Sequence, residues 1–307
     1  MINIGILWDE EVSWNGGKPF NGEPDDTYSF FSDLAEEENV RIYIAKYSWY
    51  RQGALEKAWK WNEGWEKVEQ LDIDGVFDKF VFNKDTRRLK RLIADEVGII
   101  NDPELEELCK DKLETYRIFP DKVPETRKAS GDAISEMRKK YGKVVLKPRY
   151  SFGAKGIHIL DKGDEVPETG ENYIVQRFVD SSGGIDGLVD GSHDLRAIIV
   201  NGEIEANYLR YNENSRISNV SEGGVKEVVD QEEFPEEAVE LVEEVNSEID
   251  FQPSIFSVDI FFDSEQEPWI VELNSKPGLN FYGDERMREN LRPVMESLLE
   301  SFRTIGV

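Results

Sequence analysis

Residues 268–283 read "PWIVELNSKPGLNFYG", so polar residues come directly after an apolar strand. Successive side chains of a strand point to opposite faces, and Glu272 and Asn274 therefore share one face of the predicted strand 269–274. Two oxygen donors on one face are ligands that a hard cation prefers. The same pair also fits an ordinary polar strand end, so other parts of the chain must separate the two interpretations.

A third oxygen donor lies in the preceding strand, 254–263, which reads "SIFSVDIFFD" and contains Asp259. If the two strands are antiparallel neighbours, Asp259 lies beside Glu272. Three oxygen donors would then meet at two strand ends, an arrangement that suits Mg²⁺ shared with phosphate oxygens. The following "SKPGLN" is expected to turn over this site.

A loop of small residues follows a buried strand in "KVVLKPRYSFGAKGIHIL", residues 143–160. The loop lets backbone N–H groups approach a phosphate, and Lys147 and Lys155 add positive charge. Its small residues are Gly153, Ala154 and Gly156. The spacing matches neither the P-loop nor the dinucleotide fingerprint. Taken alone, a glycine hairpin with surface lysines explains this stretch equally well.

Two arginines lie on apolar strands between 194 and 211, in a hairpin whose turn is predicted at Asn201-Gly202. Arg196 and Arg210 are either hairpin surface residues or two guanidinium groups that reach an anion, because arginine is rarely buried without a partner. The strand before them, "NYIVQRFV" at 172–179, reads by itself as a plain core strand.

The first 100 residues alternate strands with helices, which predicts an α/β domain with a mostly parallel sheet. Strands are expected at 2–8, 40–47 and 74–82, and helices at 27–39 and 85–98. The Trp-rich segment 48–70 is a partner or oligomer face, a substrate pocket, or packing of Trp49, Trp59 and Trp65 on an amphipathic helix. The packing interpretation is favoured. Further helices are expected at 103–119, 130–142, 235–249 and 284–303.

Composition excludes several classes of function. The chain has 307 residues and a net charge of −27, which argues against nucleic-acid binding because that requires a basic surface. No apolar run approaches the roughly 20 residues of a membrane helix. One Cys and two His argue against a zinc site, and the single Cys suits a cytoplasmic protein. A metal, if bound, is expected on carboxylates.

The order of these segments resembles the ATP-grasp superfamily, and most closely its glutathione-synthetase and ribosomal-protein glutamate ligase branch. The resemblance runs from Asn101 to Gly278. It rests on "INDPELEELCKDKLETY", "VPET", "VVLKPRYSFGAKGI", "IVQRFVD", "DLRAIIVNGEIEANYLR" with "NVSEGG", and "VDIFF" followed by "VELNSKPGL". It implies an N-terminal α/β domain (1–100), then a two-part ATP-grasp fold of α+β subdomains (101–180 and 181–307) with ATP between them.

The resemblance also implies roles for individual residues. The residues implied in nucleotide binding are Lys112, Lys147, Gly153, Ala154, Lys155, Gly156, Gln176, Arg177, Val179 and Asp180. The lysines would contact the phosphates, the backbone of Arg177 and Val179 would contact adenine, and Asp180 would contact the ribose. Asp259, Glu272 and Asn274 would hold Mg²⁺, with Mn²⁺ as an alternative. Arg196, Arg210 and Asn219 would act at the γ-phosphate and the acyl centre. The sequence departs from the pattern at Gln176-Arg177, where many relatives have Gln-Glu.

The activity implied is an ATP-dependent carboxylate–amine ligase that forms an amide through an acyl phosphate and releases ADP and phosphate. The expected substrates are a small carboxylate and an amine, such as amino acids or small peptides of the glutamate or γ-glutamyl type. Two alternatives stay open: a kinase on the same fold that stops after phosphoryl transfer, and a non-catalytic nucleotide-binding module. Assembly as a homodimer or homotetramer is also open.

Overall fold

The N-terminal domain is built on a seven-stranded sheet in the order β3-β4-β2-β1-β6-β7, with β5 paired to β4. This computed structural model describes residues 1–22, 24–151, 155–211 and 225–305. The strands are β1 (Ile2–Trp8), β2 (Val40–Lys46), β3 (Tyr50–Arg51), β4 (Ala54–Trp61), β5 (Trp65–Asp72), β6 (Gly75–Asp78) and β7 (Ile99–Ile100). Helices α1 (Pro24–Glu37) and α2 (Lys84–Glu96) connect parallel strands. The predicted α/β domain is confirmed, but the prediction of a mostly parallel sheet holds only for β2, β1, β6 and β7, because β3, β4 and β5 add antiparallel pairs.

The prediction of a helix in the Trp-rich segment is wrong, because residues 54–72 form the antiparallel hairpin β4–β5. The two strands pair opposite charges across the ladder, including Lys57 with Glu69, and such cross-strand pairs stabilise a sheet. Trp59 is 1% exposed, and Trp14 packs edge-on against it with ring centroids 5.5 Å apart. Trp59 therefore packs in the core as predicted, but it does so from a strand and not from a helix.

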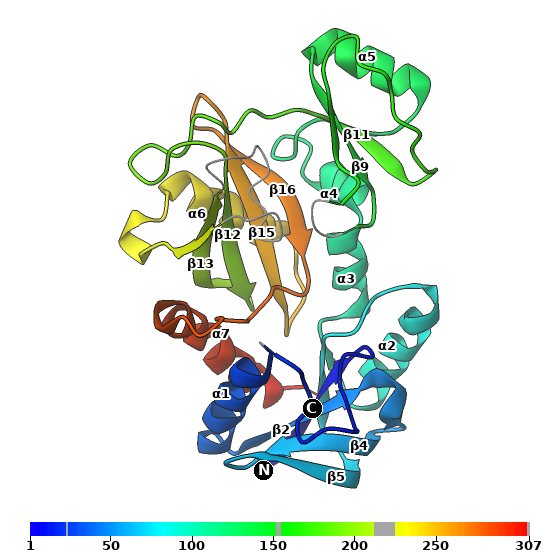
Figure 1. Ribbon diagram of the computed structural model, residues 1–307, viewed down its shortest axis with the longest axis vertical. Coiled ribbons are helices and arrows are strands. Elements are labelled where there is room, and N and C mark those ends of the chain that lie inside the picture. Colours follow the sequence, from blue (N-terminus) through cyan, green and yellow to red (C-terminus); the bar gives the residue numbers. More distant parts are fainter. Residues whose placement is uncertain (23, 152–154, 212–224, 306–307) are drawn as a thin grey trace.

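A small four-stranded sheet, ordered β10-β9-β11-β8, forms a separate layer with α5 (Gly131–Tyr141), and is green at the top of Figure 1. Its antiparallel strands are β8 (Thr126–Lys128), β9 (Val144–Pro148), β10 (His158–Leu160) and β11 (Tyr173–Arg177). Apolar side chains of α5 and of the sheet, such as Met137 and Leu146, share one buried cluster. This cluster fixes the strand that carries Lys147.

The connection into this layer consists of two helices, α3 (Pro103–Lys110) and α4 (Lys112–Ile118), where the sequence predicted one. Asp111 separates them, because its carboxylate accepts hydrogen bonds from the backbone N–H groups of Leu113 and Glu114 and caps the second helix. Arg149 holds the same carboxylate through bonds of 2.6 and 2.5 Å. Cys109, on α3, is 2% exposed and packs in the core of the third sheet.

The third sheet has five strands in the order β14-β13-β12-β15-β16 and carries the C-terminal half of the chain. Its strands are β12 (His193–Val200), β13 (Glu203–Tyr211), β14 (Val225–Val228), β15 (Ile255–Phe262) and β16 (Pro268–Asn274). The β12–β13 turn has positive φ at Asn201 (51°) and Gly202 (92°), which confirms the predicted turn. Apolar residues of α6 (Glu236–Glu248) pack on one face, and those of α7 (Glu285–Phe302) on the other.

The five-stranded sheet lies between the other two layers (Figure 1). Its α7 face shares one apolar cluster with the N-terminal domain, whereas the site-bearing end faces the small sheet. No described helix is both long and apolar enough to cross a membrane.

Candidate active site

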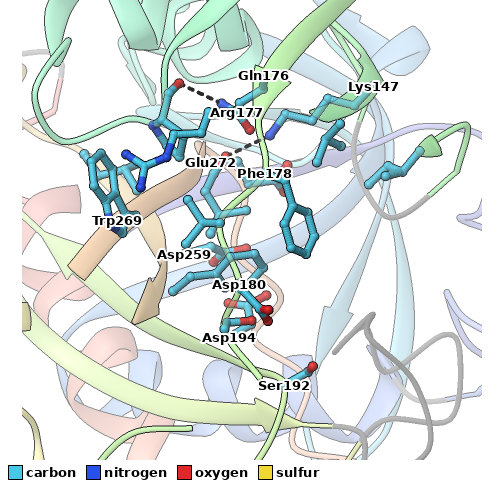
Figure 2. A pocket seen from close by; sticks show the side chains of 18 of the residues that line it. Lys147, Gln176, Arg177, Phe178, Asp180, Ser192, Asp194, Asp259, Trp269 and Glu272 are labelled. Atoms are coloured by element: carbon cyan, nitrogen blue, oxygen red, sulfur yellow. Dashed lines mark hydrogen bonds between the residues drawn. The ribbon is translucent and has the colours of Figure 1, made fainter. Parts of the chain in front are cut away.

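A cavity of about 340 Å³ lies between the small sheet and the five-stranded sheet (Figure 2). Its size is at the lower end of the range for small-molecule sites. Many of the residues singled out from the sequence line it: Lys147, Gln176, Arg177, Val179, Asp180, Arg196, Arg210, Asp259, Glu272 and Asn274. Residues that are far apart in the sequence therefore converge on one site.

One end of the cavity is apolar. It is lined by Val145, Ile157, Ile159, Phe178, Val179 and Trp269. The guanidinium of Arg177 lies over the ring of Trp269, 5.0 Å from its centroid. The backbone N–H of Arg177 already donates to the carbonyl of Glu125 (2.8 Å), so the backbone of this residue has only its carbonyl to offer an adenine. This end can enclose a flat ring between aliphatic and aromatic side chains.

Gln176 lines the cavity, but its side-chain amide is bound to the neighbouring strand and loop. Its amide nitrogen donates to the hydroxyl of Thr126 (2.7 Å) and to the carbonyl of Pro124 (3.4 Å), and the residue is 6% exposed. The side chain therefore ties β11 to β8 and supports the segment that leads to Val179 and Asp180.

Lys147 extends from β9 into the cavity, and its ammonium donates to the carbonyl of Val271 on β16 (3.3 Å). Burial, together with the nearby Lys112, lowers the pKa of Lys147 from its ordinary 10.5 to about 8, although Glu272 acts in the opposite direction. Lys112 lies 3.5 Å from the carboxylate of Glu272 and also donates to the carbonyl of Ser151. Two cations thus flank Glu272 between the sheets.

We expect the affinity for metal-free nucleotide to fall as the pH rises through about 8, because Lys147 then loses its charge. Lys147→Arg should flatten this dependence, since a guanidinium stays charged. Calorimetric titration of ADP at a series of pH values measures both effects. A wild-type affinity that does not change over this range would contradict the expectation.

The lowered pKa of Lys147 also affects stability. Folding favours the neutral amine, so burial of Lys147 costs stability below a pH of about 8, and this cost disappears as the pH rises towards 10.5.

The other end of the cavity is charged and centres on Asp259. Arg196 grips this carboxylate with two hydrogen bonds of 2.6 Å, and Arg210 adds a third of 2.6 Å. Arg210 also donates to Asp194. These guanidinium groups lower the pKa of Asp259 to about 2 in spite of its burial, whereas burial raises the pKa of Asp194 to about 7. Of the two interpretations of the arginines, surface residues or anion contacts, the surface one is wrong.

The predicted pairing of Asp259 with Glu272 on adjacent antiparallel strands is confirmed. Asp259 pairs with Glu272 across β15–β16, and Ser257 pairs with Asn274 two residues further along. Among the described residues, no three His, Cys, Asp or Glu side chains form a cluster that could hold a metal. Glu272 and Asn274 nevertheless offer a carboxylate and an amide oxygen on one face of β16, and both line the cavity. Such donors fit Mg²⁺ when phosphate oxygens complete its coordination.

Two further predicted residues lie outside the cavity wall. Lys155 and Gly156 are exposed beyond the loop and are not part of the cavity wall. Gly156 has φ of +77°, and a Cβ there would lie 2.7 Å from the hydroxyl of Tyr173, so the position requires glycine. Gly153, Ala154 and Asn219 lie outside the described residues.

Sequence reasoning missed Phe178, Asp194 and Trp269, which also line the cavity. Asp194 precedes Arg196 by two positions on β12, so strand alternation alone places both on one face. The two aromatic residues had no comparable signal, because an aromatic residue at a strand end reads as core.

Residues 109–278 match the family model described as the ATP-grasp domain. No curated protein matches the chain.

Several solved structures have a similar fold. The ATP-grasp ligase PsnB, solved with a phosphomimetic precursor variant, Mg and ADP, is 13% identical with a TM-score of 0.62, over 98% of this chain and 99% of that one. The D-alanine–D-alanine ligase of Bacillus anthracis, solved with ATP, is 12% identical with a TM-score of 0.58, over 99% and 98%. A RimK domain ATP-grasp protein of Sphaerobacter thermophilus is 12% identical with a TM-score of 0.61, over 98% and 99%. These likenesses confirm the predicted fold class.

Proposed function

The chain belongs to the ATP-grasp family, and we propose that it is an ATP- and Mg²⁺-dependent carboxylate–amine ligase. The observation that carries the proposal is the cavity between two sheets, with an apolar end that includes Val145 and Val179 and a charged end that includes Asp259 and Glu272. The apolar end suits a nucleotide base, and the charged end suits a triphosphate and its metal. ATP would then span the two sheets.

The residues have distinct tasks in this proposal. Lys147 and Lys112 neutralise the charge of the phosphate oxygens, and the carboxylate of Asp180 accepts hydrogen bonds from the ribose hydroxyls. Glu272 and Asn274 would hold Mg²⁺. Asp259 would join them if one of its carboxylate oxygens were released from an arginine. The metal would neutralise charge that develops during phosphoryl transfer. Arg210 is the cation between Asp194 and Asp259 at the cavity's charged end, next to where an acyl phosphate would form.

The reaction needs positioning more than a covalent protein nucleophile. A substrate carboxylate attacks the γ-phosphorus of ATP and yields an acyl phosphate and ADP. An amine then attacks the acyl carbon, loses a proton and displaces phosphate, which leaves an amide. Cations and metal carboxylates suit this chemistry, because they stabilise charge without forming a bond to the substrate. Enclosure between the sheets would protect the acyl phosphate from water.

The substrate class in the proposal is an amino acid or a small peptide that supplies a glutamate-type carboxylate, as in the glutathione-synthetase and glutamate-ligase branch. Two structural neighbours support an amino acid or a peptide as substrate: one is named as a D-alanine–D-alanine ligase, and another was solved with a precursor peptide. The chain as a whole has a net charge of −27, which repels anions. The lysines and arginines at the cavity provide a local positive charge that attracts them.

A product screen tests the proposal. The protein is incubated with ATP, Mg²⁺ and pairs of amino acids or short peptides, and ADP, phosphate and product masses are measured. We expect ADP and phosphate in equal amounts, together with a product that has lost one water relative to its two substrates. ADP with a stable phosphorylated compound would instead identify a kinase. Nucleotide binding without any turnover across the panel would identify a non-catalytic module.

A further inference from the structure

The turn that follows β16, residues 275–278, is held by side chains from outside its own sheet. The carbonyl of Ser275 accepts a hydrogen bond from the amide of Asn101 (2.7 Å), and the carbonyl of Pro277 accepts one from the ammonium of Lys79 (3.1 Å). Between them, the side chain of Lys276 leaves the turn and reaches the end of β6. Three consecutive residues are thus fixed by the N-terminal domain and the segment that follows it.

Lys276 ends in a buried quartet of charges that consists of Asp78, Lys90, Glu106 and Lys276. Its ammonium lies 2.5 Å from Glu106 and 3.3 Å from Asp78, and donates to the carbonyl of Phe80. Lys90 pairs with the same two carboxylates, at 2.9 Å from Glu106. Two cations and two anions balance, as a buried charge cluster requires. The exposed fractions of Lys90, Asp78 and Glu106 are 0%, 2% and 3%.

The backbone of Lys276 acts on the cavity. Its N–H donates to the side-chain oxygen of Asn274 (2.9 Å), which fixes the rotamer of that amide. An amide oxygen accepts two hydrogen bonds, so a second lone pair is left for a ligand. The side chain of Lys276 therefore belongs to the buried quartet, while its backbone N–H orients Asn274.

We propose that Lys276 is a positioning residue for the Mg²⁺ site, and that the quartet transmits the placement of the N-terminal domain to Asn274. The inference rests on the proposed function, because it takes Asn274 as a metal ligand. A purely structural quartet would stabilise the domain contact equally through either lysine. A positioning role belongs to Lys276 alone, because Lys90 lies on α2 and the polar and ring contacts described for it involve only the quartet and Phe80.

The test compares two double variants that each leave one neutral pair with Glu106. Asp78→Asn/Lys276→Met keeps Lys90, and Asp78→Asn/Lys90→Met keeps Lys276. Both remove one negative and one positive charge from the same cluster, so the remaining pair stays neutral and we expect the fold to be retained. ADP binding is titrated by calorimetry without metal and then over a series of Mg²⁺ concentrations. This readout does not depend on finding the carboxylate or the amine.

We expect the Lys276 variant to need at least tenfold more Mg²⁺ for half of its metal-induced gain in affinity, with metal-free ADP affinity within twofold of the wild type. The Lys90 variant should match the wild type in both measurements. Equal Mg²⁺ responses in the two variants would overturn the positioning role and leave the proposed function intact. A wild type whose ADP affinity does not respond to Mg²⁺ would overturn the metal site itself, and the inference with it.

Discussion

Replacing Glu272 by glutamine and Asn274 by alanine is expected to reduce ADP formation at least about 1,000-fold, with the fold retained. A loss of this size corresponds to about 4 kcal/mol of transition-state stabilisation, within the several kcal/mol that a bound metal supplies. Both side chains lie at the end of β16 on the cavity wall and outside the apolar clusters, so their removal leaves the core unchanged. Steady-state ADP release measures the loss, and circular dichroism checks the fold.

A matched control comes from the same hairpin. Glu265 lies in the exposed connection between β15 and β16, away from the cavity, and Glu265→Gln removes the same charge as Glu272→Gln. Its ADP release should equal that of the wild type. If the double variant released ADP at the wild-type rate, neither residue would hold the metal, and the polar strand end would be the correct interpretation of this sequence.

Asp259→Asn is expected to destabilise the protein by about 3–5 kcal/mol, the usual cost of removing one partner from a buried ion pair. Arg196 and Arg210 both donate to this carboxylate, and the substitution would leave two buried guanidinium groups with Asp194 as their remaining acid. The midpoint of thermal unfolding should fall by roughly 6–15 °C. Differential scanning calorimetry measures the shift, and Asp250→Asn at an exposed position is the control for loss of a charge.

The pH dependence of this contribution follows from the lowered pKa of Asp259, which is about 2 in the folded protein against 3.8 ordinarily. A lowered folded pKa means that the stabilisation is fully present above about 3.8 and is lost as the pH falls through about 2. Wild type should therefore remain more stable than Asp259→Asn from neutral pH down to about 4, since the Asp259 carboxylate stays ionised over this range. A difference that disappeared already near neutral pH would mean that the arginines do not hold the ionised carboxylate.

The end of the site that carries Asp259, Glu272 and Asn274 was predictable because it depends on local rules. Strand alternation alone places Glu272 and Asn274 on one face, and antiparallel pairing of two neighbouring strands brings Asp259 opposite Glu272. Positive φ at Asn201 and Gly202 likewise follows from the residue types. These features need only a few residues of context, which a sequence provides.

Features that depend on distant partners were not predictable. A buried arginine requires an anion, but nothing near Arg196 in the sequence shows that the anion is Asp259, 63 residues away. The spacing of Trp59, Trp61 and Trp65 fits a helix as well as a strand, and only the paired charges of β4 and β5 decide between them. The quartet around Lys276 draws on β6, α2 and α3, so its members have no shared pattern in the sequence.

Cys109, the chain's single cysteine, is enclosed by the core of the five-stranded sheet, and burial raises the pKa of its thiol far above the ordinary value. A buried neutral thiol does not react with maleimide reagents. Cysteines introduced at the exposed positions Lys139 on α5 and Glu243 on α6 would therefore accept a pair of dyes without removal of the native residue. Energy transfer between the dyes would then report in real time whether the two sheets approach each other as nucleotide is added.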